Sequence, residues 1–152
     1  MPETALNKAM LEDTNDSWDE VDTLLDNGAD PNEVGENGRN ALHIAVIMSH
    51  DRGVFQRILE GINNINANDN EGNTALIIAA DMGHYYFVED IMKINGVDVN
   101  HRNNGGRSAM DYARHNYENQ IDRQLIFQQV INFLTRQRLP SRLMGLKNKL
   151  RF

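Results

Sequence analysis

The stretch GNTALIIA at residues 72–79 decides the fold, because similar stretches lie on either side of it at one fixed spacing. The chain reads GRNALHIA at residues 38–45 and GRSAMDYA at residues 106–113, so the three leading glycines are 34 residues apart. A repeat of this length is one supersecondary unit that buries its apolar face by stacking on similar units. The sequence therefore predicts a solenoid, and its function is to be sought on a surface of the stack.

Each unit is predicted to hold two helices. Asn40, Thr74 and Ser108 follow the leading glycines by two residues, and their side chains can accept hydrogen bonds from the free amides of a first helical turn. A second helix is predicted from the apolar residues at helical spacing in 54–59 and 87–92.

Glycine and asparagine mark the ends of these units. We expect the second helix to end at a left-handed glycine, Gly61 in one unit and Gly96 in the next. The polar segments 32–38, 66–72 and 100–106 are rich in Asn, Asp and Gly, which favour turns. They are predicted to be hairpin loops between successive units.

These stretches resemble the ankyrin repeat, whose signature includes Thr-Pro-Leu-His-x-Ala. The resemblance is carried by GADPN at residues 28–32, ALHIA at 41–45 and GNTALIIAADMGH at 72–84. The signature proline is alanine in all three clear units, and the histidine is kept only at His43. The resemblance implies an all-α fold, an ankyrin-repeat solenoid of helix pairs with short hairpin loops.

The predicted ankyrin-repeat domain covers residues 1–136, and its end units are atypical because they cap the stack. The expected units are about 5–37, 38–71, 72–105 and 106–136. The last unit is expected to end in a helix over about 121–136. The residues expected to cover the last stack face are Ile121, Leu125, Ile126, Val130, Ile131, Phe133 and Leu134.

Residues 137–152 are predicted to be a basic amphipathic tail. The net charge is −7 overall, but residues 136–152 hold six bases and no acid, while residues 1–135 carry −13. The leucines of the tail follow helical spacing at Leu139, Leu143, Leu146 and Leu150. Several roles stay open: a solvated tail, contact with an anionic membrane or an acidic partner, packing on the first or last unit, or a secretion signal.

Composition and motifs indicate no catalytic or cofactor site. The chain has no cysteine, and its five histidines are not at metal-ligand spacing. The sequence lacks a P-loop lysine, a Gly-x-Ser-x-Gly motif, an apolar run that could span a membrane and a visible signal peptide. We expect no enzyme activity, no cofactor or metal, no nucleic-acid partner and a cytoplasmic monomer. Membrane contact is expected only through residues 137–152.

The resemblance implies a protein partner that binds at the hairpin tips and in the concave groove. In the ankyrin layout, the last turn of each first helix faces this groove, and exposed methionines there would form an adaptable apolar surface. Burial of these methionines between the helices is the alternative. The expected partner-binding residues are Glu36, Asn37, Arg39, Ile47, Met48, Asn70, Glu71, Asn73, Asp81, Met82, Arg102, Asn104, Arg107 and His115. A short, cysteine-free, asparagine-rich ankyrin protein also resembles effectors that intracellular bacteria deliver into the host cytosol.

Overall fold

Eight α-helices occur in residues 2–12, 15–49 and 51–136, the part of the chain that the computed structural model describes. They are α1 (Ala5–Leu11), α2 (Asn15–Asp26), α3 (Ala41–Ile47), α4 (Arg52–Gly61), α5 (Ala75–Met82), α6 (Tyr85–Met92), α7 (Ala109–Asn119) and α8 (Gln124–Arg136). Within these residues the extended pairing is limited to one bridge, between Asn68 and Thr74. The predicted all-α fold is confirmed, and the predicted tail at 137–152 lies outside the described residues.

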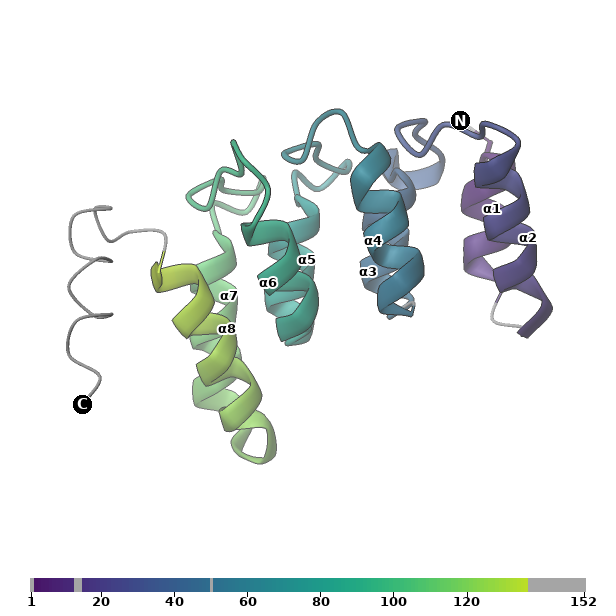
Figure 1. Cartoon of the computed structure of the whole chain (residues 1–152). Coiled ribbons are helices and arrows are strands. Elements are labelled where there is room, and N and C mark those ends of the chain that lie inside the picture. The colour runs from purple at the N-terminus through teal and green to yellow at the C-terminus, as the bar shows by residue number, and fades with distance from the viewer. Residues whose placement is uncertain (1, 13–14, 50, 137–152) are drawn as a thin grey trace.

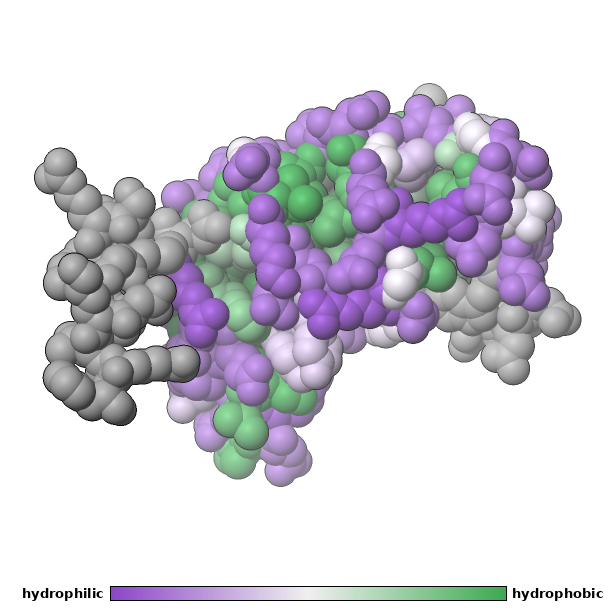
Figure 2. Space-filling model, in the orientation of Figure 1, coloured by the Kyte–Doolittle hydropathy of each residue, from purple (hydrophilic) through white to green (hydrophobic). Residues whose placement is uncertain are grey.

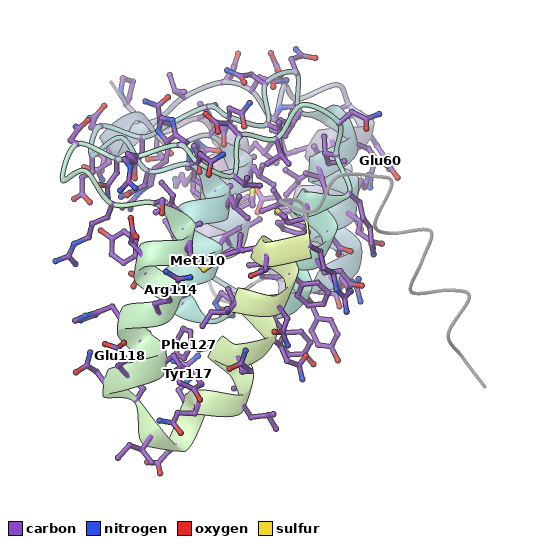
Figure 3. The ribbon with its side chains drawn as sticks, turned by 90° about the vertical axis from the view of Figure 1, so that its left-hand side faces the viewer. Glu60, Met110, Arg114, Tyr117, Glu118 and Phe127 are labelled. Atoms are coloured by element: carbon purple, nitrogen blue, oxygen red, sulfur yellow. The ribbon has the colours of Figure 1, made fainter. Side chains whose placement is uncertain are left out.

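The helices stack as four pairs in chain order (Figure 1). Helices α1, α3, α5 and α7 contact one another in sequence and form an inner layer, and α4, α6 and α8 do the same in an outer layer. The loops between pairs gather along one edge of the stack, and seen along the stack they extend past α7 on the inner side (Figure 3). A concave side therefore lies between the inner helices and the loops.

The predicted helix starts are confirmed by their capping hydrogen bonds. Asn40 accepts from the amide of His43 at 3.2 Å, and Thr74 and Ser108 each cap their helix at 3.3 Å. The predicted left-handed end at Gly61 is wrong, because Gly61 is the last residue of α4 and the chain continues extended at Ile62. A Cβ at Gly61 would come within 2.8 Å of Pro31, so the preceding unit, and not the backbone angle, excludes a side chain there.

The core runs continuously through the stack. Phe55 of α4 is fully buried and stacks on Phe87 of α6, with ring centroids 4.2 Å apart. The last face is formed differently from the prediction, because Ile121 and Leu125 are 78% and 75% exposed. Ile121 lies in the 3₁₀ turn η2 (Ile121–Arg123), so the regular helix begins later than predicted, and Leu125 lies on the exposed side of that helix.

The buried residues of α8 are Phe127, Val130 and Leu134. They repeat at i, i+3 and i+7, the spacing of one helical face. Figure 3 places Phe127 and Met110 between α8 and α7. Val130 and Leu134 therefore close the stack as predicted, whereas Ile121 and Leu125 do not.

Neighbouring loops are joined by backbone hydrogen bonds. The amide of Asn70 donates to the carbonyl of Asn37 at 2.9 Å, and the amide of Asn104 donates to the carbonyl of Glu71 at 3.0 Å. The Asn104 side chain also donates to the carbonyl of Asn70 at 3.0 Å. These bonds fix the spacing of the loops and make the loop edge a continuous surface.

A pair of glycine substitutions separates backbone strain from contact between loops. Gly72 and Gly106 both have a positive φ, 79° and 75°, but only at Gly72 would a Cβ meet Asn104, 2.8 Å from its amide nitrogen. Gly106→Ala should cost about 1–2 kcal/mol of stability from the left-handed backbone alone. Gly72→Ala should cost about 1–3 kcal/mol more, the usual range for overpacking. Urea denaturation of the two variants measures the difference, and equal losses would mean that the loops do not hold one another.

Candidate functional site

Two adjoining clefts open on the concave side. The central cleft, of about 240 Å³, is lined by Arg39, Ile47, Asp69, Glu71, Asn73, Ile77, Ile78, Asp81, Met82 and Tyr112. The N-terminal cleft, of about 240 Å³, is lined by Glu3, Leu11, Glu36, Asn37, Arg39, Ile44 and Ile47. Both contain Arg39 and Ile47, so together they form one groove across the first three units and into the fourth.

The floor of the central cleft is apolar because inner helices supply it. Ile78 and Met82 lie four residues apart on α5, so they share one helical face. Ile47 ends α3 on one side, and Tyr112 of α7 lies on the other. Met82 and Ile78 are half-buried, so each leaves apolar surface open to a partner.

The rim of the central cleft is polar and mainly acidic. Asp69, Glu71 and Asp81 face it against one base, Arg39. Asp69 shapes its own loop, since its Oδ1 accepts from the amides of Glu71 at 3.0 Å and Asn73 at 2.9 Å. Its other oxygen is 3.7 Å from the Nε of Arg39, and neither of these two buried atoms has a hydrogen-bond partner. Asp69 and Arg39 thus form an ion pair in the wall of the cleft, and Glu71 and Asp81 are the exposed acids of its rim.

In the N-terminal cleft, Glu3 supplies the carboxylate that the loop itself lacks. The residue 34 places before Asp69 is Gly35, which has no side chain. Glu3 reaches into the same loop and accepts from the amide of Glu36 at 3.0 Å. A Cβ at Gly35 would lie 2.0 Å from the Oε1 of Glu3, so glycine is required for this approach. Both clefts therefore have an acidic side chain in their loop wall.

His43 holds the loop wall to α3. Its Nε2 donates to the carbonyls of Ala67 at 3.1 Å and Asn73 at 3.2 Å, while its Nδ1 accepts from the amide of Asn40 at 3.3 Å. The Nδ1 also lies 2.6 Å from the Oδ1 of Asn40, and burial favours a neutral ring, which with its proton on Nε2 can donate to both carbonyls. Burial lowers the pKa of His43 below its ordinary value of 6.5, with Asp69 opposing this effect and Arg39 adding to it.

Acidification should therefore weaken the fold. Burial also lowers the pKa of His84. Both rings are neutral in the folded chain and bind protons in the unfolded chain near pH 6.5, so their contribution is complete above that pH and is lost as the pH falls toward the folded pKa. Three carboxylates have a lowered pKa, namely Asp30, Asp90 and Asp111. Their contribution to stability is lost only below about pH 3.8, the ordinary pKa of aspartate.

The free energy of unfolding should fall between pH 7.5 and pH 5.0, by at most about 1.4 kcal/mol per pH unit for each of the two histidines, and the melting temperature should fall with it. Scanning calorimetry over this range measures the fall. Replacing the exposed His115 with glutamine should leave it unchanged. A melting temperature that is constant or that rises on acidification would contradict the assignment of a neutral His43.

Eight of the fourteen residues predicted to bind a partner line the groove. They are Glu36, Asn37, Arg39, Ile47, Glu71, Asn73, Asp81 and Met82. Other residues that the structure brings there were not predicted to bind a partner. These are Glu3, Leu11, Ile44, Asp69, Ile77, Ile78 and Tyr112. The binding role of the whole set stays a prediction.

Six predicted residues lie outside the two clefts. Met48 follows α3 and is half-buried against the core, so the methionine surface predicted from two units contains only Met82 in the groove. Asn70 and Asn104 are engaged in the bonds between loops described above. The remaining three are placed as follows: Arg102 pairs with Asp111 at 2.8 Å, Arg107 lies over the Tyr112 ring at 5.5 Å, and His115 is exposed beside Asn119.

Other surfaces of the described residues are less suited to binding a partner. Figure 2 shows the outer face as mainly hydrophilic, with small hydrophobic groups between the outer helices. A cleft of about 380 Å³ lies where α4, α6 and α8 begin. Its polar groups are already engaged: Arg52 pairs with Asp90 at 2.6 Å, Arg123 donates to the carbonyl of Met82 at 2.6 Å, and His84 contacts Ser49 at 2.9 Å.

Residues 2–12, 15–49 and 51–136 offer neither a metal site nor a membrane span. No three acids or histidines in these ranges are grouped so that they could hold a metal ion. Helices of these ranges are all too short or too polar to cross a membrane.

Comparison with known proteins agrees with the architecture. A family model described as ankyrin repeats (3 copies) matches residues 6–103 and 49–129. The chain is 35% identical over 96 residues to neurogenic locus notch homolog protein 2 of Homo sapiens, a match that covers 62% of this chain and 4% of that protein. It is 41% identical over 75 residues to the neurogenic locus Notch protein of Drosophila melanogaster, with coverage of 49% and 3%.

A viral protein is similar as well. The chain is 35% identical over 95 residues to a protein of Acanthamoeba polyphaga mimivirus whose name describes an ankyrin repeat protein, with coverage of 59% of this chain and 16% of that protein. The chain thus spans only a small part of the length of the curated relatives it matches.

Proposed function

Because this chain belongs to the ankyrin-repeat family, we propose that it is a non-catalytic interaction module that binds a protein segment along its concave groove. Ankyrin repeats generally serve as protein–protein interaction modules. Stacked repeats present extended concave surfaces suited to this role. In this chain the proposed binding site consists of the central and N-terminal clefts, and their lining determines the chemistry of the segment that they accept.

The observation that carries the proposal is the pairing of an open apolar floor with a fixed acidic rim in the central cleft. Protein interfaces bury a central apolar contact inside a polar rim, and a few residues dominate their energy. Ile78, Met82 and Tyr112 supply that central contact. Asp69, Glu71 and Asp81 supply a rim that favours a partner with basic side chains. A segment with apolar and basic residues side by side meets both requirements.

The loop edge supports the proposal because it holds the rim in place before binding. Asp69 is fixed by two backbone amides, and its loop is joined to the loops on both sides. A surface that is ordered in advance loses less conformational entropy when a partner binds. The groove can therefore select a partner by the positions of its charges.

A matched pair of substitutions tests this function. Ile47 lines both clefts, whereas Ile94 is 37% exposed on the outer side near the end of α6. Immobilised full chain, Ile47→Asp and Ile94→Asp are each used to capture proteins from a lysate of the source cell, with quantification by mass spectrometry. Proteins held by the wild type and by Ile94→Asp should be lost from Ile47→Asp at unchanged helix content. Equal capture by all three would place binding elsewhere.

A further inference from the structure

The charge of the chain is divided between two parts that can meet. Residues 1–135 carry −13, whereas residues 137–152 hold five bases and no acid. The same sixteen residues contain four leucines, a methionine and a phenylalanine. This segment therefore combines the basic and apolar side chains that the central cleft is suited to accept.

The central cleft is complementary to such a segment in two respects. Its rim bears three acids against one base, and two of these acids, Glu71 and Asp81, are exposed and can meet basic side chains. Its floor exposes part of Ile78 and Met82, which can cover a leucine side chain. The N-terminal cleft adds Glu3 and Glu36 farther along the same groove.

The segment begins close enough to reach this groove. Figures 1 and 3 both place the carboxyl end of α8, at Arg136, toward the loop edge of the stack. Sixteen extended residues span up to about 55 Å. Packed helix axes lie about 8–10 Å apart, so a path from α8 across one layer and along two units is about 30 Å. The segment can therefore pass the last loop and lie in the central cleft.

We propose that residues 137–152 occupy the central cleft of their own chain when no partner is bound, and that a partner must displace them. This inference rests on the proposed function of the groove, because the segment acts as a competitor for the same surface. A binding site that is open for only a fraction of the time binds its partner more weakly by that fraction. The tail would thus set the affinity of the module.

Hydrogen exchange on the full-length chain tests the proposal with charge-neutralising variants. Glu71→Gln combined with Asp81→Asn removes two exposed rim charges without altering the loop bonds of Asp69. Glu60→Gln combined with Glu118→Gln is the matched control, since both acids are exposed and neither lines the groove (Figure 3). In the wild type and the control, amides of residues 137–152 should exchange at least threefold more slowly than in the free peptide of the same sequence.

The rim variant should lose most of this protection, and so should the wild type at high salt, because the attraction between exposed charges is screened there. Equal protection in the rim variant and the control would overturn the proposal and place the tail elsewhere, for example on the exposed Ile121 and Leu125. Peptide-like exchange in the wild type would overturn it as well.

Vesicles containing phosphatidylserine separate the groove from a membrane as the site of the tail. If the cleft holds the tail, the rim variant should bind vesicles more tightly than the wild type, because its tail is released. Equal binding of both chains to the vesicles would overturn the proposal. A partner captured through the groove while the tail is unprotected would leave the proposed function standing and reject only this inference.

Discussion

Replacing Phe55 with alanine is expected to lower the free energy of unfolding by about 3–5 kcal/mol, the usual cost of removing a buried aromatic ring. Phe55 is 0% exposed and stacks on Phe87 at 4.2 Å between the second and third units. Each unit depends on its neighbours for burial, so a cavity at this interface weakens the whole array and not one helix pair. Urea denaturation followed by circular dichroism measures the loss.

Leu125→Ala is the control, because it removes apolar atoms at a position that is 75% exposed. Its effect should stay within about 0.5 kcal/mol, as is usual for surface substitutions. A loss at Leu125 as large as that at Phe55 would show that α8 packs with a different face inward. A loss below about 1 kcal/mol at Phe55, far under the range for such residues, would place that ring outside the core.

Met82→Glu is expected to weaken partner binding at least tenfold, which corresponds to about 1.4 kcal/mol. Met82 lies in the floor of the central cleft, and a carboxylate there would remove apolar contact and add a charge beside three acids. The fold should tolerate the change, because Met82 is half-buried and its backbone carbonyl is held by Arg123 at 2.6 Å. Isothermal titration with the captured partner and a thermal melt measure the two effects.

Met48→Glu provides the comparison. Met48 is packed against the core and lies outside both clefts. Its replacement should lower stability by about 1–3 kcal/mol, the cost of burying a polar group, with partner affinity little changed for the folded fraction. If Met48→Glu weakens binding while Met82→Glu does not, the groove has been assigned to the wrong side of the inner helices.

The helix pairs and their starts could be predicted because they depend on residue type and spacing within one unit. Asn40, Thr74 and Ser108 cap their helices through contacts three residues away. The face that α8 turns inward could not be predicted in the same way. Ile121 lies in a 3₁₀ turn before the regular helix, and Leu125, two residues before the buried Phe127, lies on the opposite side of α8.

Features that depend on contacts between units were also missed. Gly61 is required by the approach of Pro31 from the unit before it, and Gly35 by the approach of Glu3. Sequence spacing indicates neither contact, since each joins residues about thirty places apart without a repeated pattern. The floor of the cleft was found only in part for a similar reason, because Tyr112 reaches it from the next unit.

Photo-crosslinking from inside the groove tests whether a partner protein binds there. Tyr112 lies in the central cleft, and Tyr86 is 50% exposed on α6 of the outer layer. Each is replaced in turn by p-benzoylphenylalanine, which keeps an aromatic ring at the position, and the full chain is irradiated in a lysate of the source cell. If a partner binds in the groove, position 112 should form a covalent adduct with a partner protein and position 86 should form none. An adduct from position 86 and none from position 112 would contradict binding in the groove.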